Sequence, residues 1–120
     1  MSPIIGRPAV GALLLLLFWA PVLAQDNGGL ERRGELLLNS NCSRCHAVTG
    51  SGASPHASAP PFRTLGQRYP IDSLAEALAE GLYTGHPDMP EFVFDIPDVS
   101  AILAYLESIQ VPQFKGDRVR

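Results

Sequence analysis

The chain has 120 residues, of which 46% are hydrophobic, and a formal net charge of −3. This length allows one domain at most, and a mildly acidic chain with no basic patch excludes a nucleic-acid-binding module. The only two cysteines are three positions apart, which excludes a disulfide that stabilises a long loop.

The N-terminal segment 1–24 is predicted to be a secretory signal peptide. Its single basic residue, Arg7, precedes a nearly continuous apolar run that ends in small residues before Gln25. An uncleaved membrane anchor is the alternative, but Pro21 and the shortness of the run favour cleavage. Loss of Arg7 reduces nine basic residues to eight against twelve acidic ones, so the mature domain, 25–120, has a formal charge of −4. We expect its ordered part to span about 29–111.

Residues 30–41 are predicted to form an amphipathic helix that leads directly into Cys42. Leu30, Gly34, Leu37 and Leu38 recur at helical spacing, and charged residues occupy most of the other side. A glycine inside a helix costs about 1 kcal/mol relative to alanine. Gly34 therefore favours a second helix crossing this one at close range.

Residues 47–66 are rich in Gly, Ser, Ala and Pro without periodicity, so they are predicted to form a loop. A second helix is expected over 74–80, because Ser73 and Glu76 have the spacing of a capping box, and Gly81 is its expected end. The apolar positions at helical spacing here are Leu74, Leu78 and Leu82.

Residues 83–94 are predicted to be extended and irregular, because Pro87 and Pro90 each push the preceding residue out of helical geometry. A final helix is expected to follow Asp95, a favourable N-cap residue, with Pro97 tolerated in the first turn. The expected buried stripe of this helix consists of Val99, Ile102, Leu103, Leu106 and Ile109.

Cys42, Cys45 and His46 form the motif C-S-R-C-H. Two thiols separated by two residues can add across the two vinyl groups of one haem, and the adjacent histidine can bind the iron. The motif therefore predicts one covalently attached haem c. One alternative is half of a zinc site, whose other ligands would come from His56, His86 or carboxylates. Another is a thioredoxin-like thiol pair, which would need a βαβ context that nothing in the sequence indicates.

Taken together, these features resemble a bacterial class I c-type cytochrome, a small monohaem protein, over essentially the whole mature chain. The segments that carry the resemblance are Gly34, the C-S-R-C-H motif, A-P-P-F at 59–62, G-H-P-D-M-P at 85–90 and I-L-A-Y-L at 102–106. The resemblance implies an all-α, small cytochrome c fold. In this fold three to four helices wrap around one covalently attached haem, with long irregular loops, and the first and last helices cross.

Met89 is the expected second axial ligand of the iron. It is the only methionine left once the signal peptide is removed, it lies in a proline-flanked segment, and it matches the ligand segment of the family. A thioether is a soft ligand that favours ferrous iron and raises the potential, which suits an electron carrier. His86 and, more distantly, His56 are the competing ligands.

The resemblance also implies that His46 donates its other ring nitrogen to a downstream proline carbonyl. Pro60 matches that position, and Pro61 remains open. Because Trp19 lies in the signal peptide, the haem propionates need other partners, although the charged candidates also fit solvated loop residues. The candidate propionate partners are Arg63, Arg68 and Tyr69. The apolar residues expected to shield the haem are Phe62, Leu65, Leu78, Tyr83, Phe92 and Phe94.

The predicted function is single-electron transfer by an exported, periplasmic protein that is not itself an enzyme. It would act between a protein donor and a protein acceptor, either free or as the haem subunit of a dehydrogenase or oxidase complex. It would contact a membrane only if the N-terminal segment is retained. The alternative is a haem enzyme or a gas or redox sensor with an open or displaceable distal ligand, although only His56 and His86 are available for acid–base chemistry. A thiol-redox or metal-binding module is a third hypothesis.

Overall fold

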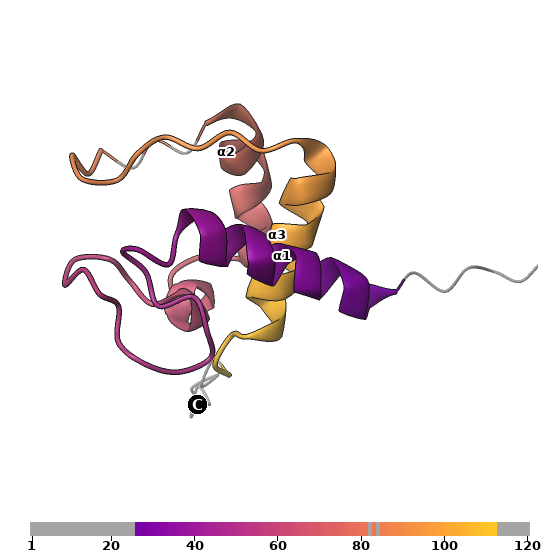
Figure 1. Ribbon diagram of the computed structural model, residues 1–120, viewed down its shortest axis with the longest axis horizontal. Helices are drawn as coiled ribbons and strands as arrows, with labels where there is room; N and C mark the ends of the chain where they lie inside the picture. Colours follow the sequence, from indigo (N-terminus) through magenta and orange to yellow (C-terminus); the bar gives the residue numbers. More distant parts are fainter. Residues whose placement is uncertain (1–25, 82, 84, 113–120) are drawn as a thin grey trace, which may run out of the picture.

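The computed structural model describes residues 26–81, 83 and 85–112 (Figure 1). Within these ranges the chain forms three α-helices and two 3-10 helices, without a strand, which confirms the predicted all-α class. In chain order the elements are α1 (Asn27–Asn41), η1 (Phe62–Gln67), η2 (Ile71–Ser73), α2 (Leu74–Glu80) and α3 (Ile96–Ser108). The predicted signal peptide, with Trp19, and Leu82 lie outside the described residues. Of the helices described, none is long and apolar enough to cross a bilayer.

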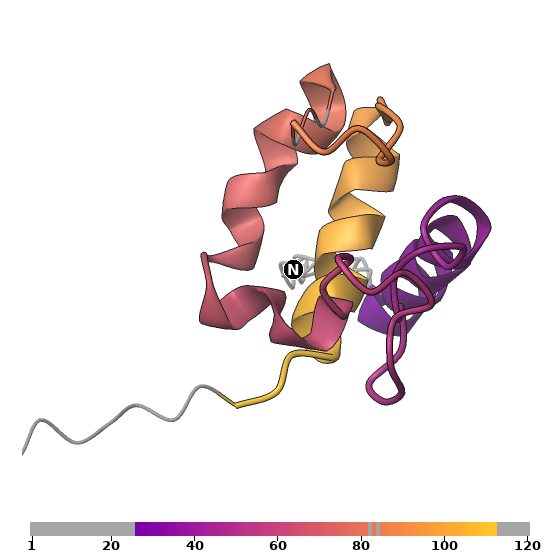
Figure 2. The same ribbon diagram turned by 90° about the vertical axis from the view of Figure 1, so that its left-hand side faces the viewer.

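Helices α1 and α3 cross at close range and share the most extensive contact between any two described elements. Figure 2 shows α3 between α1 on one side and α2 with the segment before it on the other. Gly34 permits the crossing, because a Cβ atom at this position would overlap the carbonyl oxygen of Ala101 and lie 2.8 Å from Cβ of Tyr105. The structure therefore has the close helix crossing that the sequence predicted at Gly34.

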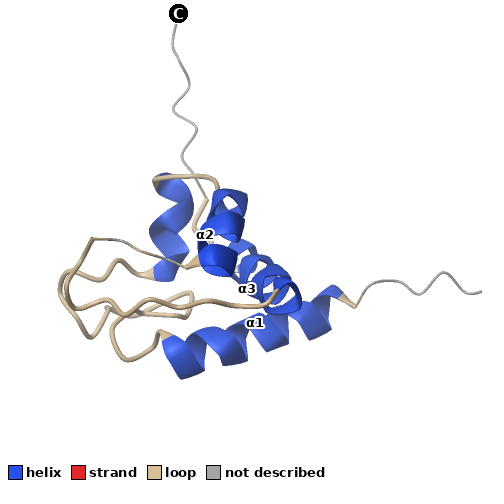
Figure 3. Ribbon diagram, turned by 90° about the horizontal axis from the view of Figure 1, so that it is seen from above, coloured by secondary structure: helices blue, strands red, loops and turns tan. Residues whose placement is uncertain are grey.

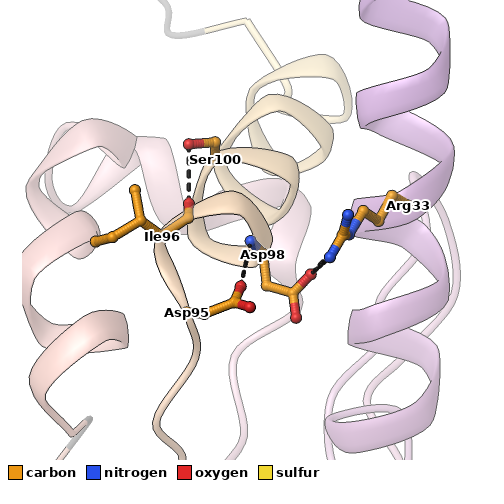
Figure 4. Close-up of polar contacts among 5 residues, drawn as sticks. All are labelled: Arg33, Asp95, Ile96, Asp98 and Ser100. Carbon is orange, nitrogen blue, oxygen red and sulfur yellow. Dashed lines mark hydrogen bonds and ion pairs between the residues drawn. The ribbon is translucent and has the colours of Figure 1, made fainter.

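The N-terminus of α3 is held by two polar contacts (Figure 4). The carboxylate of Asp95 accepts a hydrogen bond of 2.9 Å from the backbone N–H of Asp98, which confirms the predicted cap, and Pro97 lies in the first turn. Nε of Arg33, on α1, donates to the Asp98 carboxylate at 2.7 Å. Because Arg33 is about half exposed, this ion pair contributes at most about 1 kcal/mol, and the crossing depends mainly on apolar packing.

The hydrophobic core receives side chains from all five helices and from the segment that follows the C-S-R-C-H motif. Three of the five predicted stripe positions of α3 are buried, and Leu103 and Ile109 pack against the core while partly exposed. The buried members of the core are Leu38, Val48, Phe62, Leu65, Ile71, Leu78, Val99, Ile102, Tyr105 and Leu106.

The predicted loop over residues 47–66 is only partly correct, since η1 begins inside it at Phe62. Pro61 before it is extended, and its carbonyl accepts from both the backbone N–H and the hydroxyl of Thr64. A 3-10 helix of this length has i→i+3 bonds and too few turns to produce an amphipathic period. The composition of the segment therefore concealed the element.

Helix α2 has the predicted bounds and ends at Gly81, whose φ is +125°. The predicted capping box, however, is wrong. The hydroxyl of Ser73 donates to the carbonyl of Pro70 at 2.6 Å instead of accepting from α2. The physical reason is that η2 runs directly into α2, so Ser73 already has helical backbone angles and its side chain bonds to the preceding turn.

Residues 83–94 contain no helix where they are described, as predicted. The segment returns to α2, because the N–H of Phe94 donates to the carbonyl of Leu78 at 2.9 Å. Within it, the N–H of Met89 donates to the carbonyl of His86 at 3.1 Å and forms a turn. Figure 3 shows that the long loops extend from one side of the helices.

Candidate functional site

A cavity of about 850 Å³ lies between the helices and two long loops. Its volume falls within the range of sites for small molecules and cofactors, about 300–1,000 Å³. In Figure 1 the orange segment that carries Met89 lies above the purple and magenta segments that carry the C-S-R-C-H motif and the loop after it. Residues from all of these segments line the cavity, including both cysteines, all three histidines and Met89.

The C-S-R-C-H motif forms a tight turn at the end of α1. The N–H of Cys42 donates to the carbonyl of Leu38 at 2.8 Å, and this bond ends the helix. The carbonyl of Cys42 then accepts from the N–H groups of Cys45 and His46, at 3.1 and 2.9 Å. The turn brings two partly buried thiols and one imidazole to the same cavity.

Burial, with a smaller contribution from Cys45, raises the pKa of the Cys42 thiol from 9.0 to about 11. The reactive thiol of a redox pair has a lowered pKa instead, so this environment does not suit that chemistry. A zinc site would need further ligands. In the part of the chain that the structure describes, no group of three or more His, Cys, Asp or Glu side chains is arranged to hold a metal ion.

The imidazole of His46 has a defined orientation. Its Nδ1 lies 2.8 Å from the carbonyl oxygen of Pro60, the acceptor named from the sequence in preference to Pro61. A carbonyl only accepts, so Nδ1 carries the proton and the lone pair remains on Nε2, the nitrogen then available to a metal. The ring of Phe62 stacks on the imidazole at a centroid distance of 4.6 Å.

The three residues considered for the distal position all line this cavity. Met89 and His86 come from the segment after α2, and His56 comes from the loop after the motif. The His56 and His86 rings meet edge to face at a centroid distance of 5.8 Å, and Nε2 of His56 lies 3.7 Å from a carboxylate oxygen of Asp88. The two loops therefore contact each other beside the cavity.

Five of the six predicted shielding residues line the cavity: Phe62, Leu65, Leu78, Phe92 and Phe94. Tyr83 is the exception, since it is 86% exposed and does not line the cavity. Residue type marked it as apolar, but in an irregular segment no period indicates which side chains turn inward.

Two of the three candidate propionate partners, Arg68 and Tyr69, line the cavity, and Arg63 does not. The guanidinium of Arg63 instead donates to the carbonyl of Gly52 at 2.7 Å, within the loop that follows the motif. Burial raises the pKa of Tyr69, with Arg68 acting in the opposite direction, so its phenol is a neutral donor. Arg44 also lines the cavity and was missed, although it lies inside the motif itself.

The lining residues suit a covalently attached haem. Two thiols at the required spacing adjoin an imidazole whose Nδ1 is engaged and whose Nε2 has its lone pair, and a thioether on a separate segment lines the same cavity. Apolar side chains form much of the remaining lining of the cavity. Arginine and tyrosine side chains are available to bind the propionates of a haem. The same set offers no βαβ context and no cluster of metal ligands among the described residues.

Comparison with known proteins supports the same cofactor. The family model described as cytochrome c matches residues 31–110, a range that runs from α1 through the motif and both loops to the end of α3. No curated protein and no solved structure matches the chain significantly.

Proposed function

Because this chain belongs to the cytochrome c family, which binds haem c covalently and carries electrons, we propose that it is an exported electron carrier with His46 and Met89 as the axial ligands of one haem. The observation that carries the proposal is the His46–Pro60 hydrogen bond of 2.8 Å in a cavity that Met89 also lines. The bond selects the tautomer that leaves Nε2 able to bind iron.

Each residue has a distinct part in this proposal. Cys42 and Cys45 form the two thioether links, His46 supplies the proximal nitrogen, and Met89 supplies the distal sulfur. When bound, the haem iron supplies a reversible one-electron change. The apolar wall, with Phe62 and Phe94 among its members, excludes water and so tunes the potential and limits solvent reorganisation.

A haem enzyme or gas sensor is the second candidate function. It is favoured by one observation, that His56, His86 and Asp88 lie beside the same cavity as Met89 and supply groups capable of acid–base chemistry. An electron carrier needs none of these groups, and a distal ligand that stays bound prevents access of small molecules to the iron. Rapid binding of carbon monoxide to the untreated reduced protein would favour this second function.

Met89→Ala is expected to abolish the weak far-red absorption band of the ferric protein after maturation with haem, because the band arises from sulfur ligation of the iron. His86→Ala is the matched control, since His86 lies three residues away on the same segment and lines the same cavity, and this variant should keep the band. Absorption spectra of the two purified variants decide the matter. An unchanged band in Met89→Ala, or its loss only in His86→Ala, would contradict methionine ligation.

Export is expected to remove residues 1–24, so that the mature protein begins at Gln25. Intact-mass measurement of the haem-loaded protein from the periplasmic fraction checks this. Ala24→Tyr should block processing, since it replaces the small residue before the cleavage site, whereas Asp26→Asn should not. Recovery of the parent chain at full length in the membrane fraction would instead support the retained anchor.

A further inference from the structure

Gln110, just after α3, makes three hydrogen bonds with one partly buried side chain. Its Oε1 accepts from the N–H of Gly66 at 2.7 Å, and its Nε2 donates to the carbonyls of Phe62 and Leu106 at 2.9 and 2.7 Å. Both protons of the amide are therefore used. The next residue, Val111, adds a backbone bond of 2.9 Å to the carbonyl of Arg63. The end of α3 is thus tied to both ends of η1.

Helix η1 is also the element that holds His46. Phe62, its first residue, stacks on the imidazole, and the Pro60 carbonyl that accepts from Nδ1 lies two residues before it. The carbonyl of Phe62 that accepts from Gln110 is therefore only two peptide units away from the carbonyl that accepts from His46. On the other side, the N–H of Phe62 donates to the carbonyl of Ala47, the residue after His46.

The close approach of Gln110 depends on the absence of a side chain at position 66. A Cβ atom there would lie 3.0 Å from Oε1 of Gln110 and 3.4 Å from its Cγ, a tighter contact than such atoms normally make. Gly66 therefore lets the amide reach across η1 to the carbonyl of Phe62. Two hydrogen-bond partners of Gln110, Gly66 and Phe62, lie 44 and 48 positions before it in the sequence.

We propose that Gln110 is a positioning residue for the proximal side of the haem: it fixes η1 against α3, so that the Pro60 carbonyl and the Phe62 ring hold His46 in the orientation that binds iron. The inference rests on the proposed function only in taking His46 as the ligand. A firm Nδ1–H···O bond makes the imidazole a more basic ligand, which stabilises ferric over ferrous iron and lowers the reduction potential. Loosening η1 weakens that bond and raises the potential.

Two variants of Gln110 and one control test the proposal on the haem-loaded protein. Gln110→Leu removes all three hydrogen bonds, whereas Gln110→Glu keeps an acceptor for Gly66 but faces two carbonyls with a carboxylate. The control is Gln67→Leu, the same glutamine-to-leucine replacement at an exposed position on η1 itself. The readouts are the reduction potential and the hydrogen-exchange rate of the Gly66 amide and the His46 Nδ1 proton.

Gln110→Leu is expected to raise the potential, and both Gln110 variants are expected to accelerate exchange of the His46 Nδ1 proton. The ferrous-to-ferric ratio at a fixed applied potential should rise about two- to tenfold, where tenfold corresponds to about 59 mV for one electron. Exchange at Gly66 should accelerate in Gln110→Leu more than in Gln110→Glu, and Gln67→Leu should match the parent throughout. Should Gln110→Leu not fold, the exchange rate of the His46 Nδ1 proton in Gln110→Glu carries the test, because the added carboxylate itself lowers the potential.

The proposal would be overturned by variants that keep the parent potential and the parent His46 exchange rate while Gly66 exchanges faster, since Gln110 would then only stabilise the fold. The proposed function would stand in that case, because the His/Met absorption spectrum would be unaffected. A parent protein that lacks this spectrum would overturn the proposed function itself.

Discussion

Gly34→Ala is expected to lower the free energy of unfolding by about 3 kcal/mol, because the added methyl group meets backbone atoms that cannot turn away. The new Cβ atom would overlap the carbonyl oxygen of Ala101 and lie 2.7 Å from its carbonyl carbon. At about 4 °C per kcal/mol for a domain of this size, the melting temperature should fall by about 12 °C. Thermal and denaturant unfolding measure the change.

The matched control is Gly28→Ala, on the same helix but exposed. The atom nearest to a Cβ there is a carboxylate oxygen of Asp26 at 3.3 Å, at the end of a side chain that can move. Its effect should lie between none and a gain of about 1 kcal/mol from helix propensity. Equal losses of unfolding free energy at both positions would show that α1 tolerates alanine at neither position. The crossing with α3 would then not be the cause.

The consequence of Gly34→Ala extends to the site, since the crossing positions residues of the cavity from both helices. Cys42 follows the last residue of α1, and Ile102, the most deeply buried large side chain among the described residues, lies on α3. Separating the helices moves one thiol away from the wall formed by the other helix. We therefore expect a lower yield of haem-loaded protein in Gly34→Ala, in step with its loss of stability.

The helices that the sequence predicted well are those whose signals are local. Asp95 and Pro97 define the start of α3 within three residues, and Gly81 ends α2 because a φ of +125° suits only glycine. Gly34 could be interpreted in the same way, because a glycine inside a helix costs about 1 kcal/mol relative to alanine and so favours a close crossing. Such features depend on the residues next to them, so they can be interpreted without knowledge of the tertiary structure.

Helix η1, which the sequence missed, depends on contacts between distant residues. Helix η1 has no period of its own and is held by the amide of Gln110, more than 40 positions away. The capping-box prediction at Ser73 failed because η2 precedes α2 without a break. Tertiary contacts decide the first outcome, whereas the second is local, because the Ser73 hydroxyl bonds to the carbonyl of Pro70 three residues before it.

The residues predicted for the candidate site also form two groups, those named from residue type and order and those named from side-chain type alone. The C-S-R-C-H motif and Met89 could be named because their chemistry depends on residue type and order, and the structure brings both to one cavity. Tyr83 and Arg63 were named for their side chains alone, and the structure turns Tyr83 to solvent and Arg63 to Gly52. In irregular segments the direction of a side chain is set by tertiary contacts, which residue type does not encode.

Replacing both Cys42 and Cys45 by serine is expected to abolish covalent attachment of haem, since a hydroxyl does not form the thioether link. Haem-dependent staining of a denaturing gel and intact-mass measurement should show no added mass in the double variant. Each single serine variant should retain one link and a reduced yield. Ser43→Ala is the control within the motif. The Ser43 hydroxyl donates to the carbonyl of Asn39, so this variant removes a contact within the chain and keeps both thiols.

Gly34→Ala disturbs both the crossing of α1 and α3 and the haem site. The double serine variant changes only the covalent links to the haem. The crossing of α1 and α3 is untouched in the serine variant, whereas apolar residues that line the cavity, among them Phe62 and Leu78, also belong to the core. Haem that remains bound without covalent links should still cover these side chains. The haem-loaded serine variant should therefore unfold cooperatively in denaturant and then release its haem. Covalently bound haem in that variant would contradict attachment through these thiols. Release of haem without loss of helical structure would show that α1 and α3 hold the fold without the cofactor.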